Sequence, residues 1–153
     1  MNTAVLRIAS VLLLCVGCAT SGPPFEAVRE VPPGKALVYI YRPSGLIGGG
    51  VRYHVAARGE RIVFLKPGGY FPYIAEPGEI EFWAQTEAKD SITTDLEPGE
   101  TYYLKGTVGV GMLVGRPRFE FVDESRGWKE IRECVLLPPA AQAVPTGAST
   151  GAR

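Results

Sequence analysis

The chain has 153 residues, in which 16 lysine and arginine residues balance 16 aspartate and glutamate residues. A formal net charge of zero argues against nucleic-acid binding and against a polybasic membrane-binding patch. With 19 glycines, 13 prolines and 46% hydrophobic residues, the composition favours short apolar strands joined by tight turns over a helical bundle.

Residues 1–17 have the pattern of a secretory signal peptide of the bacterial lipoprotein type. Arg7 precedes the apolar run 8–16, and Gly17 stands immediately before Cys18. This run is roughly half as long as the 20 or so apolar residues that a membrane span needs, so we expect a cleaved signal. A thiol at this position can accept a thioether-linked diacylglycerol, which predicts lipidation of Cys18. Cys15 stands where such signals usually have leucine, and an ordinary cleaved signal with an incidental Cys18 is the alternative.

We expect the lipid alone to anchor the mature chain. Stable anchoring takes two membrane-binding signals, and the lipidated amino terminus would carry three acyl chains. Ala19 follows the cysteine in place of the aspartate that retains enterobacterial lipoproteins at the inner membrane. That resemblance implies an outer-membrane protein facing the periplasm.

Composition divides the mature chain into three parts. Residues 18–34 are rich in proline, glycine and charge, which predicts a flexible tether. Residues 138–153 lack large hydrophobic side chains and are expected to be a disordered tail. The single domain predicted between them, residues 35–137, is long enough to close one hydrophobic core.

Five turn signals divide this domain into apolar runs. Four are Pro-Gly pairs, a combination that suits type II turns: Pro33-Gly34, Pro67-Gly68, Pro77-Gly78 and Pro98-Gly99. The fifth, Arg58-Gly59, suits a tight hairpin turn.

The runs between these turns alternate between apolar and polar residues, as half-buried strands do. The run 35–42 is apolar on both faces and predicts a central strand, whereas Pro72 restricts its own strand to a sheet edge or a bulge. Helical spacing occurs only in residues 123–135, where Trp128, Ile131 and Val135 form one stripe and Asp123 or Ser125 could cap the helix. The prediction is an all-β protein: an antiparallel β-sandwich of about seven or eight short strands with a short C-terminal helix.

The order of these motifs resembles a family of bacterial lipoproteins catalogued as domain of unknown function twenty-eight forty-six. The motifs are YIYR at 39–42, L-x-x-G-x-Y at 65–70, P-G-E-x-Y-Y at 98–103 and the terminal amphipathic helix. The resemblance covers nearly all of residues 35–137. It implies a secreted β-sandwich and transfers no catalytic residues.

Two glycine-rich loops, 44–50 and 109–115, lack the spacing of phosphate-binding and dinucleotide-binding loops, so we expect no bound nucleotide. They are nevertheless unusually apolar for loops. Their large side chains either fold back to cap the core or form an exposed rim for a partner or a lipid surface; these candidate partner residues are Leu46, Ile47, Met112 and Leu113, with Val114 beside them.

A candidate binding platform comes from the outward-facing positions of two runs. Glu79 and Glu81 are two residues apart on one strand, so they share a face with Cβ atoms roughly 6.5–7 Å apart. That separation is similar to that of a glycosidase pair, but no motif predicts the cleft that a catalytic acid needs. We expect them to pair with lysine or arginine on a neighbouring strand. Trp83 and Tyr103 share their outward parity, which suggests an aromatic platform for a sugar or a peptide unless a helix covers Trp83.

The remaining chemistry-bearing residues give weak signals. His54 is the one histidine, and together with Cys134 it is too little for a metal site. Ser91, His54 and Asp95 can be written as a triad, but no sequence context positions a nucleophile. Cys134 has no partner left after signal cleavage and lipidation, so it is either buried or paired between chains. Six tyrosines are expected to fill the core with hydroxyls at its rim: Tyr39, Tyr41, Tyr70, Tyr73, Tyr102 and Tyr103.

These observations favour a lipid-anchored envelope protein with a non-catalytic binding or structural role and no cofactor. The expected partners are the membrane, through the N-terminal lipid, and an envelope protein or cell-wall glycan. A small periplasmic cell-wall hydrolase and an accessory subunit of an envelope complex are the two alternatives.

Overall fold

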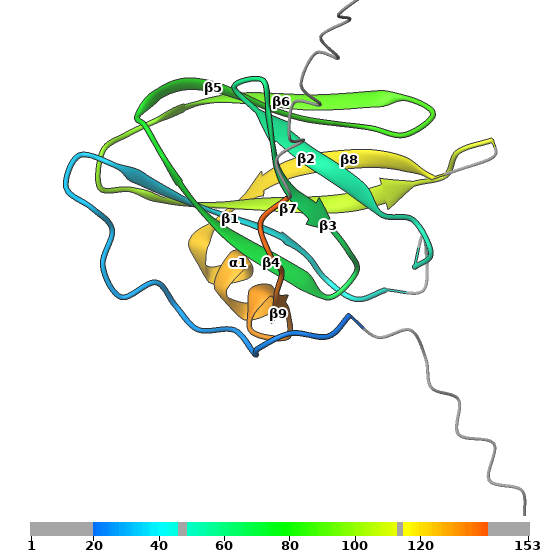
Figure 1. The fold of residues 1–153 in the computed structure, drawn as a ribbon, viewed down its shortest axis with the longest axis horizontal. Helices are drawn as coiled ribbons and strands as arrows, with labels where there is room; N and C mark the ends of the chain where they lie inside the picture. The colour runs from blue at the N-terminus through cyan, green and yellow to red at the C-terminus, as the bar shows by residue number, and fades with distance from the viewer. Residues whose placement is uncertain (1–19, 46–48, 113–114, 141–153) are drawn as a thin grey trace, which may run out of the picture.

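The computed structural model describes residues 20–45, 49–112 and 115–140, and shows an all-β protein with one short helix (Figure 1). In chain order its elements are β1 (Ala36–Arg42), β2 (Tyr53–Ala57), β3 (Glu60–Leu65), β4 (Gly69–Ala75), β5 (Gly78–Gln85), β6 (Lys89–Leu96), β7 (Thr101–Gly109), β8 (Arg116–Val122), α1 (Glu124–Ile131) and β9 (Val135–Leu136).

The strands form two sheets that pack face to face. One has the order β8-β7-β1-β4-β9 and the other the order β3-β2-β5-β6. This confirms the predicted sandwich, but the sheets are not wholly antiparallel, because β1 pairs with β7 and β4 with β9 in parallel. Between β1 and β7 the chain crosses to the other sheet and returns twice, and the antiparallel strand β4 lies between the two crossings, so β1 and β7 run in the same direction.

The predicted turns are present. The glycines of all four Pro-Gly pairs have positive φ, between 70° and 102°. Arg58 and Gly59 have φ values of 51° and 78°, as a type I′ hairpin turn requires at both central positions. A side chain at Arg58 tolerates this left-handed backbone because the turn matches the twist of β2 and β3.

The prediction of a central strand is confirmed for β1, which is buried along its whole length between β4 and β7. The prediction for Pro72 also holds. Its strand β4 pairs with β9 only at Gly69 and Tyr70, so Pro72 lies where that edge of β4 has no neighbouring strand and its missing N–H leaves no ladder bond unmade.

The five-stranded sheet is buried on both faces. Toward the other sheet it contributes side chains such as Val38, Ile40 and Leu104. On its opposite face lies a second apolar cluster containing Tyr39, Tyr41, Tyr70, Tyr103, Ile131 and Cys134. The helix α1 lies on this second face, away from β5 and β6 (Figure 1).

The predicted flexible tether is wrong for residues 20–34, which pack against the second cluster. The Phe25 ring lies against Tyr39, Tyr70 and Trp128, with centroid distances of 5.7, 5.0 and 5.4 Å. The backbone N–H of Val28 donates a hydrogen bond to the Tyr39 hydroxyl at 2.8 Å. Apolar side chains spaced among the prolines thus cover tyrosines that would otherwise face water.

The predicted tail also begins too early. Leu137 is buried in the main core, and the N–H of Ala140 donates to the carbonyl of Ile62 at 2.8 Å. The folded unit therefore includes residues 20–34 and 138–140 as well as 35–137. The rest of the tail, residues 141–153, lies outside the described residues.

The predicted helix is present, but it ends at Ile131, before Val135, the last residue of the predicted apolar stripe. Asp123 caps α1 by accepting a hydrogen bond from the N–H of Arg126 at 3.0 Å. Ile131 is fully buried and Trp128 is 41% exposed, whereas Val135 belongs to β9 and not to the helix.

Candidate functional site

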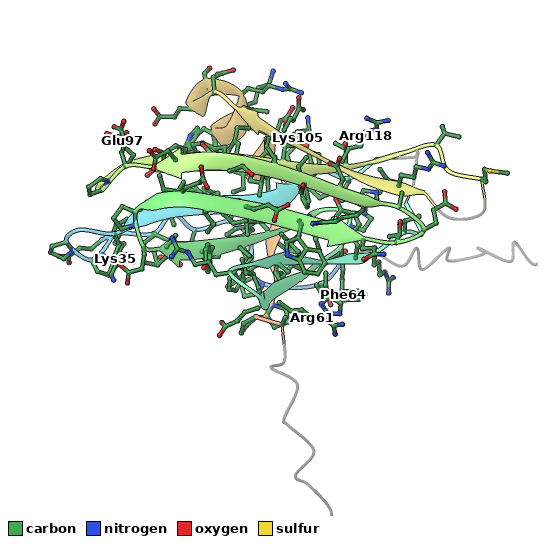
Figure 2. All side chains as sticks on the ribbon, turned by 90° about the horizontal axis from the view of Figure 1, so that it is seen from above. Lys35, Arg61, Phe64, Glu97, Lys105 and Arg118 are labelled. Atoms are coloured by element: carbon green, nitrogen blue, oxygen red, sulfur yellow. The ribbon has the colours of Figure 1, made fainter. Side chains whose placement is uncertain are left out.

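The outer face of the four-stranded sheet carries three of the four residues of the predicted platform, Glu79, Glu81 and Trp83. The register places Trp83 of β5 between Ala56 of β2 and Ser91 of β6, and Glu81 opposite Thr93. Among the described residues no helix lies over this face, so its side chains are not covered as Tyr103 is on the other sheet (Figure 2).

A positively charged side chain lies over the ring of Trp83. The Lys89 ammonium lies 5.4 Å from the centre of the indole ring, a cation–π distance. The same ammonium is 3.3 Å from Oε1 of Glu81, which is the cross-strand pairing expected for this carboxylate. Hydrogen bonds from Ser91 and then Lys89 lower the pKa of Glu81. Glu81 is therefore a carboxylate at neutral pH that can accept hydrogen bonds from a ligand.

A second aromatic pair lies on the same face, across the sheet. His54 and Phe64 face each other in the β2–β3 register, with ring centroids 4.6 Å apart. Burial, reinforced by the positive charge of Arg61, lowers the pKa of His54, so the imidazole is neutral at pH 7. Its Nδ1 is shielded from solvent and has no hydrogen-bond partner within the described structure.

Sequence reasoning missed Phe64, which is 36% exposed. The register of β2 and β3 shifts between Val55 and Ala56, and this β-bulge decides which side chains of β3 face outward. Because β3 is apolar at consecutive positions, the alternation pattern contains no signal for that choice.

Tyr103 corrects the predicted platform, because it does not lie beside Glu79, Glu81 and Trp83. It is in β7 of the other sheet, 3% exposed, and its ring stacks on Tyr39 at 5.5 Å. A helix over Trp83 was one expectation, but α1 covers Tyr103 instead. Alternation assigned Tyr103 to the correct face of its strand, but parity along one strand does not say to which sheet the strand belongs.

The two candidate catalytic arrangements have different outcomes. Glu79 shares the outer face with Glu81, as expected, but the register sets it opposite Asp95 at an open sheet surface. Ser91 faces Trp83 and hydrogen-bonds to Glu81, whereas His54 pairs with Phe64 two strands away. The structure thus keeps Ser91, His54 and Asp95 apart.

The apolar loop residues fall into two groups. Leu46, Ile47 and Leu113 lie outside the described residues, as does Cys18. Met112 does not cap the core, because it is 89% exposed, and so is Val110. The backbone N–H of Met112 donates to Oε1 of Glu87 at 3.0 Å, which ties this loop to the turn between β5 and β6.

Cys134 is buried, with 1% of its surface exposed. Its sulfur lies 3.7 Å from the carbonyl oxygen of Arg42. Burial raises the pKa of the thiol to about 12, so at neutral pH it is an unreactive core side chain. This agrees with the first of the two alternatives that cysteine counting left open.

A cavity of about 590 Å³ lies between α1, β7 and the loop that follows β1. Its charged lining is largely neutralised within the protein, because Lys105 donates to Oε1 of Glu130 at 2.8 Å. The Tyr41 hydroxyl donates to Oε2 of the same carboxylate, also at 2.8 Å. Burial raises the pKa of Glu130, but hydrogen bonds from Lys105, Tyr41 and Arg126 outweigh it and leave the pKa below its ordinary value.

This network predicts a pH-dependent stability. A lowered pKa in the folded state stabilises the fold above the unfolded pKa of about 4.3, and this contribution is lost as the pH falls through the folded pKa. Replacing Glu130 with glutamine should lower the free energy of unfolding at pH 7 by about 1.5 to 3 kcal/mol, the range for hydrogen bonds to charged groups. The difference from wild type should shrink below about pH 4.

Urea unfolding of a chain beginning at Ala19, carried out at pH 7 and again below about pH 4, measures this difference. Glu120→Gln is the matched control, because the Glu120 side chain is 47% exposed at the rim of the same network and should matter little. An equal loss at both pH values would show that the Glu130 charge does not stabilise the fold.

No protein-family model, curated protein or solved structure matches this chain. The resemblance to the lipoprotein family therefore remains a prediction. Within the described residues, no helix is both long and apolar enough to cross a membrane. In the same part of the chain, His, Cys, Asp and Glu side chains do not gather in threes as metal ligands would.

Proposed function

We propose that this protein is a lipid-anchored envelope protein with a non-catalytic binding role, and that it holds an envelope glycan against Trp83. The anchor is the diacylglyceryl group predicted on Cys18. Ala19 after that cysteine supports an outer-membrane position facing the periplasm, and the family resemblance agrees with export as a lipoprotein.

The observation that supports binding is the contrast between the two sheets. Both faces of the five-stranded sheet are covered, one by the other sheet and one by α1 with residues 20–34. The outer face of β3-β2-β5-β6 instead presents Trp83 and Phe64 together with Lys89 and Glu81. Aromatic side chains left at a surface among polar groups are typical of binding sites.

The chemistry of this face suits a saccharide better than an apolar ligand. The indole of Trp83 can stack on the C–H face of a sugar ring, while carboxylate and hydroxyl groups beside it can bond to sugar hydroxyls. Glu81 and Ser91 supply those groups next to the indole. Lys89 adds a cation that suits the carboxylates of the peptide stems that cell-wall glycan carries.

Replacing Trp83 with alanine should weaken binding to purified peptidoglycan at least about tenfold, a loss of some 1.4 kcal/mol. Co-sedimentation of the protein with insoluble peptidoglycan measures this. Thr93→Ala, an exposed change on the same face opposite Glu81, is the matched control and should bind like wild type.

Two outcomes would contradict the proposal. Wild-type protein that stays in the supernatant would exclude the glycan, and equal binding by the Trp83→Ala variant would exclude this face. If the wild-type protein releases soluble fragments from peptidoglycan and the Glu81→Gln and His54→Ala variants do not, the hydrolase alternative would be favoured over a purely binding role.

A further inference from the structure

The loops of the sandwich are divided between its two ends. Consecutive strands from β1 to β8 run in alternating directions (Figure 1). The loops that follow β1, β3, β5 and β7 therefore meet at one end, called here the anchor end. Contacts link them there: the hydroxyl of Thr86 donates to the carbonyl of Gly115 at 2.9 Å, and Gly68 lies against Ser44.

The described chain begins at this same end. The Thr20 hydroxyl donates to the carbonyl of Pro67 at 2.6 Å, and the N–H of Leu136 donates to the carbonyl of Pro23 at 2.7 Å. Gly22 fits so closely against β9 that a Cβ there would lie 2.3 Å from the carbonyl oxygen of Leu136. The start of the chain is thus held against the sheet by contacts on both sides of Gly22.

Only Ala19 lies between Thr20 and the predicted lipid-bearing Cys18. Two residues span at most about 7 Å even when fully extended. A lipid on Cys18 therefore holds the anchor end at the membrane surface, and the domain cannot turn freely as it would on a flexible tether.

The side chains of the anchor end suit a lipid surface. Val110 and Met112, in the loop after β7, are each 89% exposed. Apolar side chains on a loop tip gain free energy by entering the boundary between headgroups and acyl chains. Val110 and Met112 lie at the same end of the sandwich as the start of the described chain, and this shared end selects lipid as the surface that they meet.

The distribution of charge also favours contact between the anchor end and a lipid surface. In the anchor-end loops and the segment after α1, Arg52, Lys66 and Arg132 accompany Glu87 and Glu133. The opposite end, where Figure 2 labels Lys35 and Glu97, is more acidic: Glu76, Glu97, Glu100, Asp123 and Glu124 accompany Lys35 and Arg58. Anionic lipids attract the less acidic end and repel the other.

We propose that the anchor end rests directly on the phospholipid bilayer, with Val110 and Met112 in the interface, and so fixes the orientation of the domain. This proposal rests on the lipidation of Cys18 in the proposed function. In this orientation the strands rise from the membrane, and the Trp83 face looks sideways into the space where an envelope glycan would lie.

The test uses full-length lipidated protein carrying Met112→Cys, labelled with a polarity-sensitive fluorophore. The protein is reconstituted in vesicles of phosphatidylethanolamine and phosphatidylglycerol. Cys134 is buried and should not label in the folded protein, which the unsubstituted protein verifies. We expect the emission at position 112 to shift to shorter wavelength and to be quenched by spin-labelled lipids. The same label at Glu97→Cys, at the opposite end, should report water.

Further variants separate the possible failures. Gly22→Val should loosen the start of the chain and reduce the quenching at position 112 while the protein stays on the vesicles. If the labels at positions 112 and 97 of acylated protein both report water, docking is refuted while the lipid anchor stands. Undiminished quenching in Gly22→Val would instead overturn the claim that the fit of the chain start against β9 fixes the orientation of the domain. Mass spectrometry that finds no acyl chains on the mature protein would refute the lipid anchor itself.

Discussion

Replacing Gly127 with alanine should destabilise the protein, although alanine is the better helix former. A Cβ at this position in α1 would lie 2.3 Å from Cγ of Tyr103 and 2.5 Å from Cδ1. The ring cannot retreat, because Tyr39 stacks behind it at 5.5 Å. The helix must therefore lift from the five-stranded sheet.

The sign of this effect makes the prediction sharp. At an exposed helical position, glycine to alanine would raise the free energy of unfolding by about 0.5 to 1 kcal/mol. Overpacking costs about 1 to 3 kcal/mol, so Gly127→Ala should give a net loss, and Gly127→Val a loss of about 3 kcal/mol or more. Urea unfolding of the chain beginning at Ala19 measures both changes.

Two further variants test the mechanism. Ser125→Ala, at an exposed position of the same helix, should change the free energy of unfolding by only a few tenths of a kcal/mol. Tyr103→Leu should recover part of the loss in a double variant with Gly127→Ala, because the two positions are in contact. An unchanged or increased stability of Gly127→Ala would mean that α1 does not pack on Tyr103 as described.

Replacing Phe25 with alanine should release residues 20–34 from the sheet. The ring contacts Tyr39, Tyr70 and Trp128 in edge-to-face geometry. Replacing a fully buried phenylalanine with alanine lowers the free energy of unfolding by about 3 to 5 kcal/mol. Because Phe25 is half-buried, we expect the free energy of unfolding to fall by about 2 to 3 kcal/mol.

Local measurements identify the segment that is released. The N–H of Val28, which donates to Tyr39, should lose its protection from hydrogen exchange, and trypsin should cut after Arg29 in the otherwise folded protein. Arg29→Ala is the control for stability, since its ion pair with Glu26 is exposed and contributes little. If Phe25→Ala unfolds and exchanges like wild type, residues 20–34 are a tether after all.

Local signals carried the secondary structure. Each Pro-Gly pair supplies a fixed φ and a positive φ in succession, and each is followed within two residues by β1, β4, β5 or β7. Alternation gave the correct face for Trp83 and Glu81 because side chains of one strand can only point to two sides. These rules need no knowledge of the rest of the molecule.

The errors came where one segment depends on another. Phe25 and Val28 lie in a stretch rich in proline and charge that has no periodicity, and only the tyrosines of β1 and β4 on the second face of the sheet give them a place to pack. Phe64 was missed because a bulge between Val55 and Ala56 sets its face. Neither the packing of Phe25 and Val28 nor the outward orientation of Phe64 can be recognised from the composition of a single segment.

The sequence alone determined β1 to β8, the turns, the central place of β1 and the presence of a helix after β8, since backbone stereochemistry and alternation act over a few residues. The tertiary structure alone decided which sheet each strand joins. It thereby buried Tyr103 beneath Gly127, left Trp83 half-buried on the outer face and placed Thr20 at the end that carries Met112. Those outcomes depend on pairing and packing between residues far apart in the chain, which no local pattern encodes.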